Sequence, residues 1–113
     1  MKILVVEPLT PPYVKNIDGN LESMQKIVGG LIQAIYPFDY PEIALVCNEE
    51  GKLNNLPLNR ALYDKDGNIV DIIAGTFFLC LAPQGSENFE SLTEEQIVTY
   101  TKRFEALEFY IKQ

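Results

Sequence analysis

Residues 93–111 read TEEQIVTYTKRFEALEFYI, and this stretch decides the fold class. Thr93 and Gln96 have the spacing of a capping box, in which each side chain bonds the other residue's backbone N–H at a helix start. Beyond them, apolar residues recur on one helical face: Ile97, Tyr100, Phe104, Leu107 and Ile111. A single domain must bury such a stripe against another layer. The stretch therefore predicts a long C-terminal helix that covers one face of a sheet.

The strands of that sheet are predicted from runs of branched and aromatic apolar residues. These runs occupy residues 2–7, 13–17, 31–36, 43–47, 69–74 and 76–81. A short helix is predicted over residues 21–28, beside the long one, because apolar residues recur there at helical spacing and Gly29 follows. We therefore expect one α+β domain over residues 1–113, with an antiparallel or mixed sheet of four to six strands.

Composition narrows the class of protein. The chain has 113 residues and a net charge of -7, from 9 basic and 16 acidic residues. The basic residues are scattered, which argues against direct binding to nucleic acid. No apolar run reaches the ~18 residues of a membrane span. The first six residues resemble a signal peptide, but Glu7 and Pro8 interrupt the run, so we expect a cytoplasmic protein.

Common catalytic and metal-binding patterns are missing. The chain has no His, which excludes the usual nucleophilic triads. Cys47 and Cys80 lie in separate apolar runs, fit no zinc or redox spacing, and are expected to be buried. Residues 64–75 begin like a calcium loop, but Ile69 stands where Gly is required and Gly75 where Glu is required. We expect a turn there, no metal, no cofactor and no enzymatic activity.

Residues 48–60, NEEGKLNNLPLNR, form the candidate recognition loop. Long loops in compact domains are usually functional or disordered, and three leucines, Leu53, Leu56 and Leu58, are expected to anchor this one. Lys52 and Arg60 would hold an anionic group, and Arg60 would bind it through two parallel hydrogen bonds. Alternatively, the segment is a turn whose Asn side chains cap its own backbone. The candidate ligand-binding residues are Asn48, Glu49, Gly51, Lys52, Asn59 and Arg60.

Five stretches together resemble a family of small proteins that carries only the label of a domain of unknown function. They are residues 27–30, 35–38, 48–54, 56–60 and 71–77, and the similarity extends from Met1 to Phe104. Such proteins are common in phages, plasmids and conjugative elements of Gram-positive bacteria. The resemblance implies an accessory protein of a mobile element that works inside a bacterial cell. It implies no activity, cofactor or site residue.

Two classes of function remain. The first is a non-enzymatic binding protein that recognises a host protein or a small anionic ligand, such as a signalling nucleotide, through residues 48–60. We favour it because the residue types that carry acid–base or nucleophilic chemistry are missing or isolated. The second is a small enzyme without His or metal that uses carboxylates or Lys52 and Arg60. A further alternative is an acidic surface that competes with nucleic acid for a basic protein. The sequence carries no signature of an oligomeric state.

Overall fold

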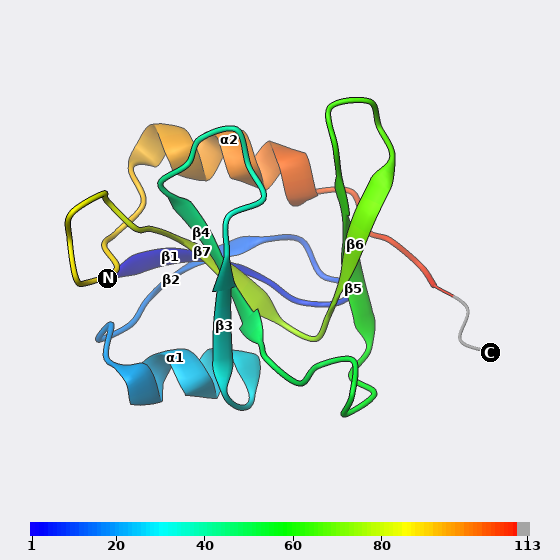
Figure 1. Cartoon of the computed structure of the whole chain (residues 1–113), viewed down its shortest axis with the longest axis horizontal. Coiled ribbons are helices and arrows are strands. Elements are labelled where there is room, and N and C mark those ends of the chain that lie inside the picture. The colour runs from blue at the N-terminus through cyan, green and yellow to red at the C-terminus, as the bar shows by residue number, and fades with distance from the viewer. Residues whose placement is uncertain (111–113) are drawn as a thin grey trace.

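The computed structural model describes residues 1–110, which form an α+β domain with two antiparallel sheets (Figure 1). The fold class is as predicted. In chain order, the elements are β1 (Lys2–Val6), β2 (Tyr13–Asn16), α1 (Leu21–Val28), β3 (Ile32–Ile35), β4 (Ile43–Asn48), β5 (Leu58–Tyr63), β6 (Ile69–Ala74), β7 (Phe77–Leu81) and α2 (Glu94–Phe104).

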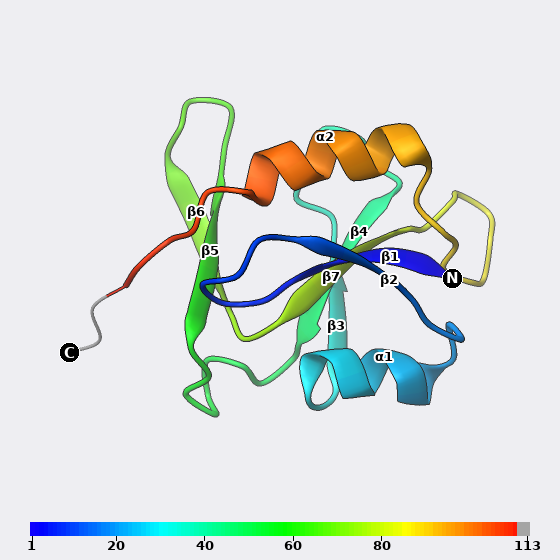
Figure 2. The same ribbon diagram turned by 180° about the vertical axis from the view of Figure 1, so that it is seen from behind.

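The main sheet has five strands in the order β2-β1-β7-β4-β3, and all neighbours are antiparallel. The β3 edge of the sheet is nearest the viewer in Figure 1, and the β2 edge is nearest the viewer in Figure 2, which shows the molecule from behind. The number of strands lies in the predicted range. Strand β6 is not part of this sheet, because it pairs with β5 in a separate two-stranded sheet. Strand β5 was not predicted, since its residues were assigned mainly to the loop.

The two helices cover opposite faces of the main sheet. Along β1, Leu4 and Val6 face the layer that contains α2, whereas Ile3 and Val5 face α1. The expectation that α1 lies beside α2 was therefore wrong (Figures 1 and 2). The reason is that the central strands are apolar at nearly every position, so both faces of the sheet are apolar and each has to be covered.

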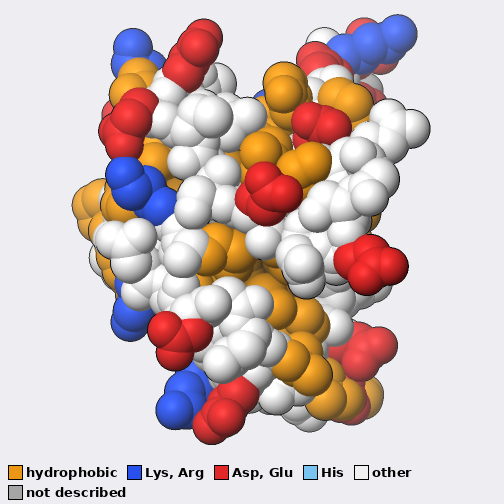
Figure 3. All heavy atoms as spheres, turned by 90° about the vertical axis from the view of Figure 1, so that its left-hand side faces the viewer, with side chains coloured by type: hydrophobic (Ala, Val, Ile, Leu, Met, Phe, Trp, Pro, Cys, Tyr) orange, Lys and Arg blue, Asp and Glu red, His pale blue; other side chains and the backbone are white. Residues whose placement is uncertain are grey.

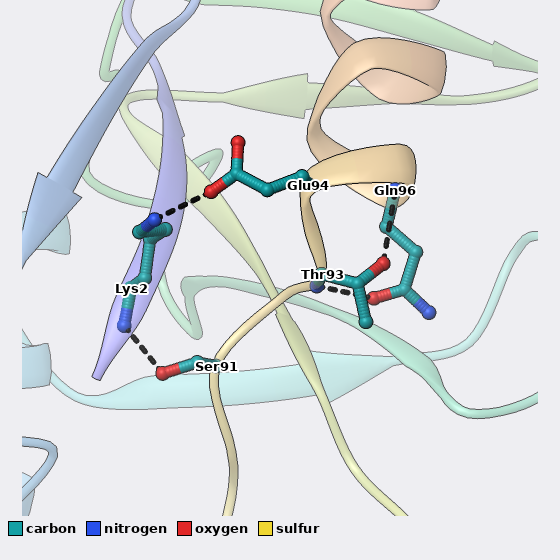
Figure 4. Close-up of polar contacts among 5 residues, drawn as sticks. All are labelled: Lys2, Ser91, Thr93, Glu94 and Gln96. Atoms are coloured by element: carbon teal, nitrogen blue, oxygen red, sulfur yellow. Dashed lines mark hydrogen bonds and ion pairs between the residues drawn. The ribbon is translucent and has the colours of Figure 1, made fainter.

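The start of α2 is fixed by the predicted capping box (Figure 4). Thr93 Oγ1 accepts a hydrogen bond from the Gln96 N–H at 3.2 Å, and Gln96 Oε1 accepts one from the Thr93 N–H at 2.9 Å. Two further contacts join this turn to β1. The Lys2 ammonium lies 2.7 Å from a Glu94 carboxylate oxygen, and the Lys2 N–H donates to Ser91 Oγ at 2.8 Å. The N-terminal strand and the C-terminal helix are thus fastened together.

The end of α2 comes earlier than predicted. Ile97, Tyr100 and Phe104 are buried as expected, but the helix ends at Phe104 and Leu107 is exposed. Ile111, the last residue of the predicted stripe, lies outside the described residues. At this end, the Phe104 carbonyl accepts hydrogen bonds from the Arg60 side chain on β5. The chain then passes along β5, where Glu108 accepts a hydrogen bond from the Ala61 N–H at 3.0 Å.

Cys47 and Cys80 are unpaired and buried, as expected, on opposite faces of the main sheet. None of the helices in residues 1–110 has the length and apolarity needed to cross a membrane. On the side that lies to the left in Figure 1, hydrophobic side chains form a band across the surface, with acidic side chains scattered around it (Figure 3).

Candidate functional site

The segment of residues 48–60 is divided between a surface turn and a strand. Asn48 is the last residue of β4, the turn follows, and β5 begins at Leu58. Asn59 and Arg60 therefore belong to a strand, and both are completely buried. The prediction of one exposed loop was wrong for its last three residues. An apolar anchor pattern such as Leu-Pro-Leu does not distinguish a loop from the start of a strand.

Arg60 binds the protein itself. Its guanidinium donates to the Phe104 carbonyl at 3.0 and 3.2 Å, to the Thr10 carbonyl at 2.9 Å and to Asn59 Oδ1 at 2.7 Å. A longer bond of 3.4 Å reaches the Glu7 carbonyl. Burial lowers the pKa of Arg60, and the nearby Glu108 carboxylate opposes this shift. The expectation of an exposed cationic anchor is corrected: Arg60 joins the end of α2 to β5 and to the β1–β2 connection.

Asn59 has a similar internal role. Its side-chain amide donates to the Val6 carbonyl at 2.8 Å and to the Gly75 carbonyl at 2.9 Å. Gly75 has a φ of +83° and separates β6 from β7. Its carbonyl lies at the bend where the chain leaves the two-stranded sheet for the main sheet. Asn59 therefore holds the two sheets together, and it has no exposed surface to offer a ligand.

Asn48 and Gly51 shape the turn. The Asn48 amide donates to the Val28 carbonyl at the end of α1, at 3.2 Å, and Asn48 Oδ1 accepts from the Glu50 N–H at 2.8 Å. The alternative in which an Asn side chain caps its own backbone thus describes Asn48. A Cβ atom added to Gly51 would lie 2.6 Å from the Ala74 carbonyl oxygen, so only glycine allows the turn to approach β6 this closely.

The exposed part of the turn lies over a small pocket of about 200 Å3. We call the surface formed by Glu49, Glu50, Lys52, Leu53 and Asp71 the acidic turn surface. The Lys52 ammonium lies 2.5 Å from an Asp71 carboxylate oxygen on β6. Leu53 is 79% exposed, so the expectation that it anchors the turn was wrong. Of the predicted site residues, the pocket brings together Asn48, Glu49, Gly51 and Lys52 and leaves out Asn59 and Arg60.

The electrostatics of this surface are negative, since three carboxylates surround the single ammonium of Lys52. Cys47 lies beneath it and donates to the Gln33 carbonyl at 3.7 Å. Burial and the Asp71 carboxylate raise the pKa of the Cys47 thiol, while Lys52 lowers it. The thiol is therefore kept protonated and is a poor nucleophile. The arrangement is suited to holding a cationic group, not to covalent chemistry.

Two polar residues that line the pocket lie outside residues 48–60 and were not predicted from the sequence. Gln33 comes from β3 and Asp71 from β6, and both are brought to the turn by the fold. Asp71 could have been recognised in the sequence, because it is the one charged residue in the apolar run of residues 69–74. A charge inside a strand that is otherwise apolar marks a position on an open face. Gln33 left no such signal.

The segment that resembles a calcium loop forms the tip of the β5–β6 hairpin, as expected. The Asp64 carboxylate accepts from the N–H groups of Asp66 and Asn68, both at 2.9 Å. These backbone hydrogen bonds, that of Asn68 above all, lower the pKa of Asp64. Within residues 1–110, no three side chains of His, Cys, Asp or Glu type are gathered as metal ligands.

Comparison with known protein families gives a match. A family model described as "Domain of unknown function (DUF3846)" matches residues 1–105. No curated protein and no solved structure matches the chain. The match confirms the resemblance to a family of unknown function. Since the family description names no activity, the function has to be inferred from the geometry of the surface itself.

Proposed function

The chain belongs to this family of domains of unknown function, and we propose that it is a non-enzymatic binding protein that recognises a protein partner through the acidic turn surface. The observation that carries the proposal is the position of Leu53. This side chain is 79% exposed at the tip of a turn whose base is held by buried hydrogen bonds. Binding residues concentrate on loops that a rigid scaffold positions in this way.

The chemistry of the partner follows from the charges around Leu53. Glu49 and Glu50 are exposed and form no ion pair among the described residues, so they are available to a basic side chain. Covering a leucine contributes roughly 1.5–3 kcal/mol. We therefore propose a partner that offers an apolar pocket to Leu53 and a Lys or Arg to the two glutamates.

A small anionic ligand fits this surface less well. The only ammonium of the surface, Lys52, is already paired with Asp71, and the other predicted cation, Arg60, is buried. The pocket of about 200 Å3 is also smaller than the roughly 300–1,000 Å3 of typical small-molecule sites. The effect of one variant on binding distinguishes an anionic ligand from a basic partner. Lys52→Ala weakens binding of an anion, whereas binding of a basic partner is maintained or strengthened because Asp71 is released.

The absence of catalysis is part of the proposal. Glu49 and Glu50 lie in water and lack the burial by which enzymes tune a catalytic acid or base. We also propose the context that the family resemblance implies, an accessory protein of a phage or other mobile element that acts on a host protein in the bacterial cytoplasm. Two unpaired buried cysteines support a reducing compartment.

The test is affinity capture from the cells that naturally produce the chain, followed by calorimetry with the captured protein. Three variants are compared: Leu53→Asp, the double variant Glu49→Lys/Glu50→Lys, and Val98→Asp. Val98 is 57% exposed on α2, away from the acidic turn surface, and serves as the control. We expect the first two to weaken binding by roughly tenfold or more, as loss of an interface hot spot does, and the control to bind normally.

Equal binding by all three variants would reject the acidic turn surface as the interface. Nucleic acid added to the same assay tests the remaining alternative, in which the chain competes with nucleic acid for a basic protein. If the captured protein is a nucleic-acid-binding protein and the chain displaces its nucleic acid, then the chain acts as a competitor. If both bind together, the chain recognises a different part of the partner.

A further inference from the structure

A second cleft lies between α2 and the connection from β3 to β4, away from the acidic turn surface. Its volume is about 730 Å3, which is in the range of small-molecule sites, roughly 300–1,000 Å3. Its lining includes Asp39 and Tyr40 from the connection, and Glu95, Tyr100 and Arg103 from α2. The proposed recognition of a protein partner uses none of these residues.

The hydroxyl of Tyr100 is the first sign of a ligand. Tyr100 is only 7% exposed, its ring packs at 4.9 Å from the Phe38 ring, and its hydroxyl has no hydrogen-bond partner within residues 1–110. No fully buried side-chain oxygen or nitrogen in the described part of the chain lacks a partner, so this hydroxyl reaches the cleft. Burial raises the pKa of Tyr100, which keeps the hydroxyl protonated and able to donate.

Arg103 is the second sign. It lies three residues after Tyr100, on the same face of α2, and its guanidinium carbon is 4.8 Å from the centre of the Phe38 ring. The guanidinium makes no ion pair and no hydrogen bond with the described residues, although the protein is strongly acidic. The aromatic contact holds the planar group in place and leaves its five donors for an anion, which a guanidinium binds bidentately.

The opposite wall supplies a flat surface and acceptors. The Tyr40 ring is 48% exposed and borders the cleft, so a planar group can stack on it. Asp39 on the same connection and Glu95 on α2 carry carboxylates that accept hydrogen bonds from N–H groups. The cleft therefore combines an anion-binding end, an aromatic wall and carboxylate acceptors.

We propose that this cleft binds a nucleoside monophosphate. The phosphate is held by the Arg103 guanidinium and the Tyr100 hydroxyl, and the base stacks on Tyr40. Amino or ring N–H groups of the base donate to Asp39 or Glu95. Because two carboxylates accompany the single cation, the cleft repels a chain of several phosphates more strongly than one phosphate group.

The first experiment titrates the purified protein with the four common ribonucleoside monophosphates, followed by two-dimensional NMR and calorimetry. Inorganic phosphate alone tests the anion-binding end of the cleft at Arg103, and the nucleosides alone test the aromatic wall at Tyr40. We expect at least one monophosphate to shift signals of α2 and of the β3–β4 connection, and to bind roughly tenfold or more tightly than either fragment. No shift with any monophosphate at about 10 mM would overturn the proposal. Equal affinity for inorganic phosphate and for the monophosphates would also overturn it, because the aromatic wall would then contribute nothing.

The second experiment uses matched variants. Arg103→Ala is compared with Lys102→Ala, which removes the neighbouring cation that does not line the cleft. Tyr100→Phe, which keeps the buried ring, is compared with Tyr36→Phe, whose ring is exposed and does not line the cleft. We expect Arg103→Ala to weaken binding roughly tenfold or more and Tyr100→Phe roughly threefold, as loss of charged and neutral hydrogen bonds does. Melting temperatures verify that each variant is folded. Unchanged affinity in Arg103→Ala would reject the cleft, while the result for the acidic turn surface would be unaffected.

Discussion

At the scale of single residues, the chain uses charged and polar side chains as internal fasteners. Arg60 and Asn59 are adjacent in β5, are fully buried, and satisfy carbonyl groups from three separate segments. An arginine suits this role because its planar group presents five donors in a fixed arrangement. The last carbonyl groups of a helix have no partner within the helix. Arg60 donates to one of them, the Phe104 carbonyl, where water or a further helical turn would otherwise supply the hydrogen bond.

Arg60→Ala is expected to lower the free energy of unfolding by about 3 kcal/mol or more. The variant leaves the buried Phe104 carbonyl and the partly buried Thr10 carbonyl without these donors and opens a cavity. Arg60→Lys is also expected to destabilise, because an ammonium cannot reach all of these acceptors. Urea unfolding measures both, with Lys65→Ala at the exposed hairpin tip as the control. If Arg60→Ala and Lys65→Ala have the same midpoint, then the internal role assigned to Arg60 is wrong.

At the scale of secondary-structure elements, helix ends are defined by side chains, and the two ends of α2 use different means. The start uses neighbours in sequence, Thr93 and Gln96, whereas the end uses Arg60 from a distant strand. Helix α1 is capped locally at both ends. Asn20 accepts from the Ser23 N–H at its start, and Gly29, with a φ of +79°, donates its N–H to the Gln25 carbonyl at its end. Asn48 from β4 also bonds the Val28 carbonyl. Local sequence therefore predicts an end that a glycine caps, as in α1, but misses an end that a distant side chain caps, as in α2.

Thr93→Ala is expected to lower the free energy of unfolding by about 1 kcal/mol, the usual contribution of an N-cap side chain. Thr99→Ala is the matched control, since it removes an exposed threonine inside the same helix, where alanine is the better helix former. Thermal and urea unfolding followed by circular dichroism compare the two. A loss in Thr99→Ala as large as that in Thr93→Ala would show that the capping box contributes nothing specific.

At the scale of the whole molecule, both faces of the main sheet are covered, so most residues of its central strands are buried. Cys80 is in β7 on the α1 side and has no exposed surface. This burial raises the pKa of its thiol from 9.0 to about 12. Below pH 9, the thiol is protonated in the folded and unfolded states alike. Above pH 9, the unfolded state loses the proton while the folded state keeps it, so the folded state becomes less stable as the pH rises.

The free energy of unfolding is therefore expected to fall between pH 8 and pH 10, and Cys80 is expected to account for about 1 kcal/mol of the fall. Urea unfolding under reducing conditions at both pH values measures the change. Cys80→Ala removes this group but keeps the other groups whose pKa is raised, such as Tyr13 and Cys47. The variant should lose less stability over this range than the unmodified protein. Equal losses would mean that water reaches Cys80 in the folded state.

The sequence alone was sufficient to predict the α+β class, most of the strands, the start of α2 and the burial of both cysteines. These features depend on local patterns: apolar runs for strands, the spacing of Thr93 and Gln96 for the cap, and the turn chemistry at Asp64. It also identified four residues of the pocket at the turn, Asn48, Glu49, Gly51 and Lys52, because turn residues that are close in sequence remain close in space.

Which polar residues face water depends on contacts between segments that are far apart in the sequence. Arg60 and Lys52 are both cations of one short segment, yet Arg60 is buried and Lys52 is exposed beside Asp71. The difference arises because β5 pairs with β6 and brings Arg60 to the end of α2, a contact between residues 44 positions apart. The cleft at Tyr100 and Arg103 likewise depends on the β3–β4 connection lying against α2. The type of a side chain limits the groups with which it can form hydrogen bonds or ion pairs. The contacts between distant segments determine which of these groups it meets in the folded protein.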